Sequence, residues 1–122
     1  MLIVTDQARI DIAKARAGEI PMPKIETIEI GNAGHSGSLP ITVTPDMQSL
    51  NNKVMEKVAF HIGRTDNRNV YQIEILENEL NGEPISEIGL RADNGTLVAL
   101  QTFAPKYKES DNIFTFDITE EF

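Results

Sequence analysis

The chain contains no cysteine and no tryptophan, and only 6% of its 122 residues are aromatic. Without cysteine it has no disulfide framework, no thiolate nucleophile and no cysteine metal site. The scarcity of aromatic residues means that packing must depend on isoleucine, leucine and valine. Hydrophobic residues still make up 40% of the chain and charged residues 25%, the composition of a folded globular protein. The length suits one domain, so we expect a single domain over residues 1–122.

Basic residues are also few: 11 lysines and arginines stand against 19 aspartates and glutamates, which gives a formal net charge of -8. Acidic residues interrupt the basic ones between Lys53 and Arg68, so no basic patch forms along the sequence. Such a chain repels phosphate backbones and anionic lipid surfaces. We therefore expect neither nucleic acid nor a membrane as a partner.

Signals for secretion and membrane insertion are missing as well. No basic n-region opens the segment that ends at Gly18. No apolar run approaches the roughly 18 residues that a membrane helix needs. The sequence therefore indicates a protein made in the cytoplasm and not secreted by a signal peptide.

The clearest local pattern is a helix from about Asp6 to Ala17. Thr5 is a typical N-cap, and Asp6 places a negative charge in the first turn, where the helix dipole favours it. Gly18 follows the last periodic residue and predicts the end of the helix. Small alanine side chains lie along one face, so we expect this face to pack closely on a sheet.

Strand-like segments fill much of the remaining chain. In the segment 53–62, Val54, Val58, Phe60 and Ile62 share a parity, which predicts one half-buried strand with these side chains inward. The strand-like segments are 24–30, 53–62, 70–76, 86–91, 96–103 and 113–119. We expect an α+β fold: one N-terminal helix packed on a mostly antiparallel sheet of about six short strands.

One hairpin has a strong turn signal. Asn94-Gly95 lies between two strand-like segments and favours a type I′ turn, because both residue types tolerate positive φ. Gly89, inside the first of these segments, predicts a bulge or a close backbone approach.

Residues with catalytic or ligand-binding chemistry do not form a known motif. The loop Gly31–Ser38 is glycine-rich, but it lacks the spacing of a phosphate- or dinucleotide-binding loop. His35 and His61 have no partners at metal-ligand spacing. Ser36 and Ser38, close to His35, lack the strand-turn-helix setting of a nucleophile. We expect no catalytic, cofactor-binding or metal-binding residue, and thus no enzyme.

Two further groups are open to interpretation. Carboxylates on alternating strands are typical of a solvated face, and we interpret five glutamates in this way: Glu74, Glu77, Glu79, Glu83 and Glu87.

The segment Pro105-Lys106-Tyr107-Lys108 is typical of a terminated strand edge that is kept soluble. It also suits a protein contact, because tyrosine offers contact area with little loss of entropy. Pro105, Lys106, Tyr107 and Lys108 are therefore our interface candidates.

The order of these segments resembles the N-terminal domain of phage tail-collar fibre proteins of P2-like phages and related prophages. A helix comes first, then a β segment that ends in a glycine loop, then two strands joined by a polar turn. The most specific part is an ordered phrase that reads Glu87-Ile88-Gly89-Leu90, Asp93-Asn94-Gly95, Thr96-Leu97-Val98-Ala99 and Tyr107-Lys108.

The resemblance implies a structural component of a phage or prophage tail, located in the virion. Such a domain attaches a tail fibre to the baseplate or tail, or acts as a short baseplate-associated adaptor. Its expected partners are other tail, baseplate or fibre proteins and copies of itself, with a trimer as the state common in such fibres. The chain is either a separate short protein or one domain of a longer fibre.

Two other functions stay open at this point. One is an assembly factor that binds a fibre and is not retained in the particle. The other is a small ligand-binding domain that uses the Gly31–Ser38 loop. Neither requires a cofactor.

Overall fold

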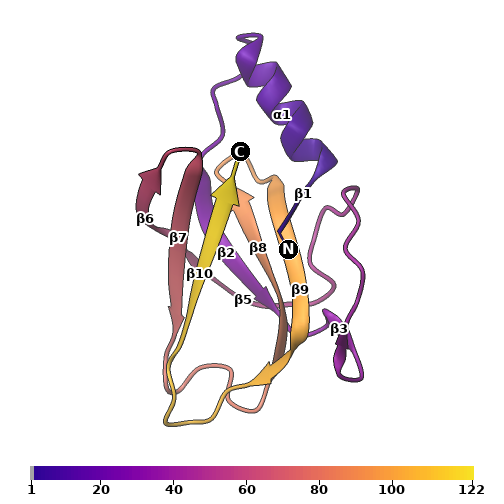
Figure 1. Ribbon diagram of the computed structural model, residues 1–122, viewed down its shortest axis with the longest axis vertical. Coiled ribbons are helices and arrows are strands. Elements are labelled where there is room, and N and C mark those ends of the chain that lie inside the picture. Colours follow the sequence, from indigo (N-terminus) through magenta and orange to yellow (C-terminus); the bar gives the residue numbers. More distant parts are fainter. Residues whose placement is uncertain (1) are drawn as a thin grey trace.

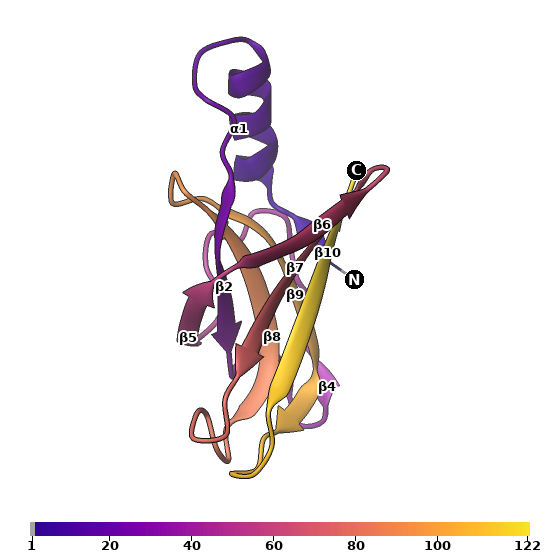
Figure 2. The same ribbon diagram turned by 90° about the vertical axis from the view of Figure 1, so that its left-hand side faces the viewer.

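The computed structural model describes residues 2–122, most of which form two facing β-sheets with one helix at their end (Figures 1 and 2). The larger sheet has the strand order β1-β9-β8-β2-β5, the smaller one has the order β10-β7-β6, and β3 and β4 form a short ribbon. All strands pair antiparallel. The elements of residues 2–122 are β1 (Ile3–Val4), α1 (Asp6–Arg16), β2 (Ile25–Gly31), β3 (His35–Ser36), β4 (Leu39–Pro40), β5 (Lys53–Val58), β6 (Phe60–Thr65), β7 (Arg68–Ile75), β8 (Pro84–Ala92), β9 (Leu97–Tyr107) and β10 (Phe114–Glu121).

The expected α+β class is therefore wrong. Strands account for 52% of the chain and helix for 9%, and the arrangement is closer to a β-sandwich. The main core lies between the two sheets, where Ile28 and Ile88 of the larger sheet are in one cluster with Ile73 and Ile118 of the smaller one. The sheets, and not the helix, bury each other's apolar faces.

The segment predicted as one strand over residues 53–62 is two strands in different sheets. β5 pairs with β2 in the larger sheet, and β6 pairs with β7 in the smaller one. Ala59 lies between them, and its N–H donates to the Glu26 carbonyl at 2.9 Å. This segment carries the chain from one sheet to the other, as strands do at the corners of a sandwich.

The predicted inward parity of this segment holds for Val54, which packs against the main core, but is wrong for the other three residues. Val58, Phe60 and Ile62 are 78%, 68% and 49% exposed. Alternation shows which side chains share a face, but only the tertiary structure decides which face is covered. An apolar stripe thus remains on the surface along β5 and β6.

The hairpin between β8 and β9 is confirmed, but its turn is not of type I′. Gly95 has a φ of +89°, whereas Asn94 is not among the non-glycine residues with positive φ in residues 2–122. The loop contains three residues, 93–95, and is closed by the Ala92 N–H, which donates to the Thr96 carbonyl at 2.9 Å. Three-residue hairpin loops place glycine at this last, left-handed position.

Replacing Gly95 with valine is expected to lower the free energy of unfolding by about 1–3 kcal/mol, because a β-branched residue is strained at positive φ. The effect is purely conformational, since an added Cβ meets no atom within 4 Å. Thermal unfolding followed by circular dichroism measures it. Gly95→Asn is the control and should cost less, because asparagine tolerates this region. Equal losses in both variants would contradict the assigned conformation.

The N-terminal helix is confirmed, with Asp6–Arg16 observed where residues 6–17 were expected. The Thr5 hydroxyl accepts from the Ala8 N–H at 3.2 Å and donates to the Leu97 carbonyl at 2.6 Å. At the other end, Gly18 has a φ of +79° and stops the helix. The expected packing of an alanine face on a sheet is observed in part. Ala8 is buried and α1 contacts β9, but Ala13 and Ala17 are exposed, because α1 stands at the end of the sandwich (Figure 2).

The helix is held to the β8–β9 loop by a buried carboxylate. Asp11 accepts hydrogen bonds from the Thr96 hydroxyl at 2.6 Å and from Asn94 Nδ2 at 3.0 Å. These bonds, the one from Thr96 above all, lower the pKa of Asp11, while burial opposes them. A depressed pKa in the folded state stabilises the fold above the ordinary value of 3.8, and this stabilisation is lost as the pH falls through the folded-state pKa.

Replacing Asp11 with asparagine is expected to lower the free energy of unfolding by about 1 kcal/mol at neutral pH, through the lost charge-assisted hydrogen bonds. The difference from the wild type should shrink as the pH falls below 4, where the wild-type carboxylate also becomes protonated. Thermal midpoints at pH 7 and at low pH test this. Asp111→Asn, at an exposed loop position, is the control and should show no such trend. A pH-independent deficit in Asp11→Asn would contradict the role of the charge.

A smaller apolar cluster lies apart from the main core. It joins Leu97 and Leu100 of β9 to Leu50, with Val43 and Met47 packed beside them. Gly89 makes room for it, because an added Cβ would lie 2.8 Å from the Leu97 side chain and 3.2 Å from that of Leu50. The predicted close approach at Gly89 is therefore confirmed.

Candidate functional site

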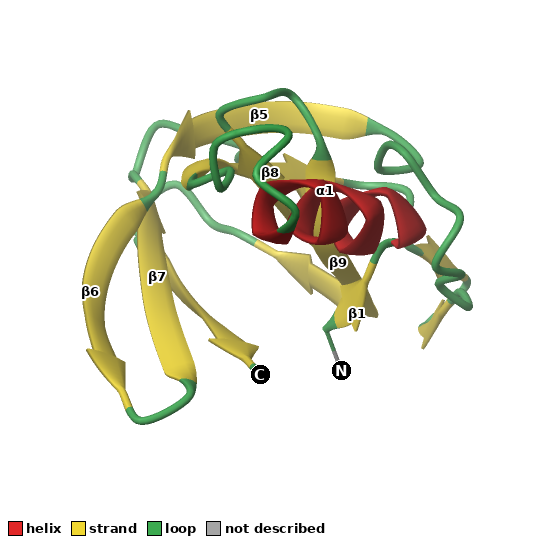
Figure 3. Cartoon of the chain, turned by 90° about the horizontal axis from the view of Figure 1, so that it is seen from above, coloured by secondary structure: helices red, strands yellow, loops and turns green. Residues whose placement is uncertain are grey.

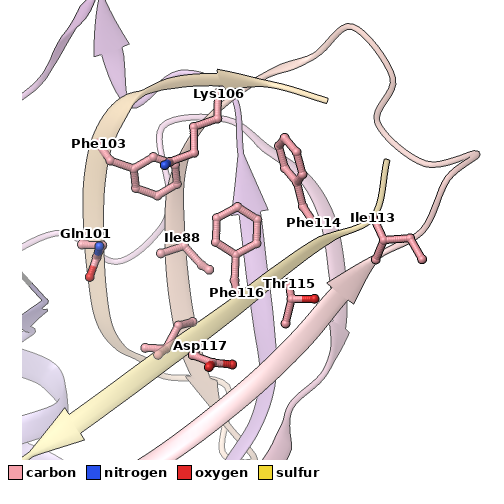
Figure 4. A pocket seen from close by; sticks show the side chains of 10 residues that line it. Ile88, Gln101, Phe103, Lys106, Ile113, Phe114, Thr115, Phe116 and Asp117 are labelled. Carbon is pink, nitrogen blue, oxygen red and sulfur yellow. The ribbon is translucent and has the colours of Figure 1, made fainter. Parts of the chain in front are cut away.

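A groove of about 630 Å³ opens between β9 and β10, on the side where the two sheets do not meet (Figure 4). Its wall is aromatic: the Phe116 ring lies 6.0 Å from the Phe103 ring and 6.2 Å from the Phe114 ring, measured between centroids. Lys106 Nζ lies 6.0 Å from the centre of the Phe103 ring. Gln101 and Asp117 add polar groups to the lining. An apolar groove with a polar rim is the usual form of a protein contact surface.

The predicted interface segment lies at the end of β9, next to this groove, and its four residues have different environments. Lys106 and Tyr107 are exposed, Tyr107 by 62%. Lys108 is only 1% exposed, and its Nζ donates to Asn81 Oδ1 at 2.6 Å and to two backbone carbonyls. Lys108 therefore holds the loop before β8, whereas Lys106 and Tyr107 face solvent. Pro105 is half-buried. The interface role of the segment remains a prediction.

Backbone hydrogen bonds attach the glycine-rich loop to side chains of β8. The Gly34 N–H donates to the Ser86 hydroxyl at 2.8 Å, and the Ala33 N–H donates to Glu87 Oε2 at 3.3 Å. An added Cβ on Gly31 or Gly34 would lie 2.4 Å from atoms of these two residues. The glycines thus permit a close approach within the chain, and these two N–H groups already have acceptors.

Glu87 does not belong to a solvated face, as its sequence context indicated. It is completely buried, and its carboxylate accepts from the backbone N–H groups of Asn51 and Asn52, both at 2.9 Å. Asn51 Nδ2 adds a third bond at 3.1 Å. The carboxylate joins the glycine loop, the segment before β5 and the first part of β8. No local sequence signal distinguishes Glu87 from the exposed glutamates of the neighbouring strands.

The two histidines lie in separate places. His35 Nδ1 is 2.7 Å from the Ser86 hydroxyl, and His61 Nε2 is 2.9 Å from Asn69 Oδ1. His35 is therefore paired with a buried serine of β8 and not with its neighbours Ser36 and Ser38. Within residues 2–122, no group of three or more histidine, aspartate or glutamate side chains has the arrangement of a metal site.

A second cleft of about 640 Å³ lies between α1 and the smaller sheet, and sequence reasoning missed it. Ile12 and Met22 contribute to its lining from the helical side, and Tyr71 and Glu120 do so from the sheet. Burial raises the pKa of Glu120. Burial also raises the pKa of Tyr71, and the nearby charge of Glu120 raises it further. These residues lie far apart in the sequence, so only the fold brings them together.

Comparison with known proteins gives one finding on family. Neither the comparison with curated proteins nor that with solved structures found a match. No helix within residues 2–122 is long and apolar enough to cross a membrane. A family model described as "Phage tail-collar fibre protein, N-terminal" matches residues 1–115, nearly the whole chain and all of the ordered phrase from Glu87 to Lys108. The chain therefore belongs to the phage tail-collar fibre protein family, as its motifs predicted, and this membership supports a structural role in a phage tail.

Proposed function

We propose that this protein attaches a tail fibre to the baseplate or tail, either as the attachment domain of a fibre or as a short baseplate-associated adaptor. The observation that carries the proposal is the family match over residues 1–115. That range includes nine of the ten strands in full and the start of β10, so the match concerns the sandwich as a whole. The protein works by burying surface against its neighbours, without turnover.

The structure supports this proposal through the way in which its surface is built. Long loops are tied down by buried polar side chains such as Glu87 and Lys108. The aromatic groove, in contrast, is lined by the exposed Lys106, and the exposed Tyr107 follows it in β9. A rigid body with an open apolar groove suits attachment, because little conformational entropy is lost when a partner binds.

We propose tail, baseplate or fibre proteins as partners, together with copies of the same chain, and the virion tail as its location. Residues 1–122 act in this proposal as one attachment domain. Lys106 and Tyr107 belong to the contact surface. Lys108 contributes indirectly, because it fixes the loop that precedes β8.

Quantitative peptide mass spectrometry on purified tails tests the proposal, with this protein measured against the tube subunit. A small fixed number of copies per particle is the expected result. Absence from particles together with abundance in the lysate would overturn attachment and favour an assembly factor. A Tyr107→Asp variant should be depleted from particles while keeping its fold, since Tyr107 is exposed. Glu109→Gln, at an exposed position nearby, is the matched control.

A further inference from the structure

The smaller sheet has two free edges. Its order is β10-β7-β6, and within residues 2–122 no strand pairs with the outer side of β6 or of β10. Figure 3, seen from above, shows β6 at the outer margin of the molecule and β10 beside the gap that separates it from β9 and β1. Free edges present rows of unpaired N–H and C=O groups, which proteins usually shorten or cover. Here the edge strands are six and eight residues long. A bulge between His61 and Gly63 places Phe60 and Arg64 on opposite faces of the sheet.

The β6 edge is apolar at its start and basic toward its end. Phe60 and Ile62 are 68% and 49% exposed, although both are large apolar side chains. Arg64 is exposed two residues later, and among residues 2–122 its guanidinium donates only to the Asp66 carbonyl of the adjoining turn. No ion pair involves Arg64 within residues 2–122. The β6 edge thus offers an apolar surface and an uncompensated positive charge.

The β10 edge has the same apolar start but an acidic end. Five consecutive residues, 114–118, line the aromatic groove, so the groove runs along the strand and its free edge. Ile113, just before the strand, is 48% exposed. Asp117, Glu120 and Glu121 follow toward the end, where Arg68 of β7 lies 3.4 Å from Glu121. Asp117 and Glu120 have no ion-pair partner within residues 2–122.

These two edges complement each other when they are set side by side in the same direction. Phe60, on the outer face of the sheet, then lies beside the start of β10 near Ile113 and Thr115. Arg64, on the inner face, lies beside the end of β10 near Glu120. The opposite direction would place Arg64 beside the phenylalanines and Phe60 beside the acids. Two β10 edges would bring carboxylates together, and like charges in close contact are unfavourable.

We propose that β6 of one copy adds to the free edge of β10 of a second copy, so that the smaller sheet continues from chain to chain. This inference rests on the proposed structural role in the tail, and it names the surface by which copies join. The contact is head-to-tail, so a growing assembly keeps one free β6 edge and one free β10 edge at its two ends. It closes into a ring where the rotation between copies allows it. Backbone hydrogen bonds provide affinity, while the apolar and charged side chains set direction and register.

Two double variants test the proposal by sedimentation velocity between about 1 µM and about 1 mM protein. Phe60→Glu with Arg64→Glu makes the β6 edge acidic, and Thr115→Lys with Asp117→Lys makes the β10 edge basic. All four positions are exposed, so the fold should persist, which circular dichroism checks. We expect the wild type to self-associate and each variant alone to associate at least about tenfold more weakly. An equimolar mixture should assemble again, because both interfaces in it are complementary.

Leu39→Glu is the matched control, because Leu39 is an exposed apolar residue on the separate β3–β4 ribbon and its replacement should leave association unchanged. Self-association of the β10 variant alone would indicate β6–β6 contacts, and self-association of the β6 variant alone would indicate β10–β10 contacts. Either result overturns the proposal. A wild type that stays monomeric also overturns it, and would leave the edges to a strand of another protein.

The sedimentation experiment tests the contact between copies, and mass spectrometry on purified tails tests the attachment function, so either proposal can fail without the other. A protein found at a fixed copy number in tails but monomeric in solution would keep the attachment function and lose the head-to-tail contact. A protein that assembles through β6 and β10 but is absent from particles would keep the contact and lose the attachment function.

Discussion

Replacing Glu87 with alanine is expected to lower the free energy of unfolding by about 3 kcal/mol or more, which makes it one of the two most damaging single changes that we predict. The carboxylate is fully buried and accepts four hydrogen bonds, from Ala33, Asn52 and two groups of Asn51. Removing a buried acceptor leaves its donors unpaired, at about 1–3 kcal/mol for each buried group that finds no substitute. A cavity adds to this loss.

Chemical denaturation followed by circular dichroism measures the effect. Glu26→Ala is the matched control: it removes an exposed glutamate from strand β2, and its effect should stay within about 0.5 kcal/mol. Glu87→Gln should fall between the two, because the amide keeps one acceptor oxygen but turns an NH₂ group toward N–H donors. A Glu87→Ala variant as stable as the control would show that the loops on either side of β8 do not depend on this carboxylate.

The second large effect is expected at the ion pair between Arg91 and Glu29. Glu29 is 2% exposed, and Arg91 binds it in a two-pronged manner, with Nε 2.6 Å from Oε2 and Nη2 3.0 Å from Oε1. Arg91→Met keeps the apolar stem but leaves a buried carboxylate without its main partner. Because the arginine is partly exposed, we expect a loss of about 2–3 kcal/mol, below the range for fully buried pairs.

A second substitution separates the charge from the packing. Arg91→Met combined with Glu29→Leu should regain much of the lost stability, because well-packed apolar side chains often replace a buried pair without cost. Lys53→Met is the control: Lys53 Nζ lies 3.7 Å from Glu29 Oε2 but is largely exposed, so its removal should cost no more than about 1 kcal/mol. If the double variant is as unstable as Arg91→Met alone, the loss arises from packing and not from the unpaired charge.

Both predictions concern contacts that join parts of the chain far apart in the sequence. Glu87 binds segments that lie 35 and 36 residues before it in the chain, and Arg91 binds a strand that lies 62 residues before it. Losing the Glu87 contact should therefore loosen loops, whereas losing the Arg91 contact should weaken the pairing of β2 with β8.

The sequence by itself determined the features that depend on near neighbours. The helix at Asp6–Arg16 follows from a cap at Thr5, a stop at Gly18 and a periodic pattern, all of which act within one or two turns. The loop around Gly95 follows from the tolerance of glycine for positive φ. The ordered phrase from Glu87 to Lys108 indicated the family, and the family model matches residues 1–115.

Only the tertiary structure decided which faces are covered. The alternation in residues 53–62 showed that Val58, Phe60 and Ile62 share a side, but the break at Ala59 sends β5 and β6 into different sheets and leaves that side in solvent. Glu87 and Lys108 look like surface residues in the sequence, and both are buried because distant segments supply their hydrogen-bond partners. Strand pairing and burial depend on contacts between residues far apart in the chain, and such contacts leave no local pattern from which they could be predicted.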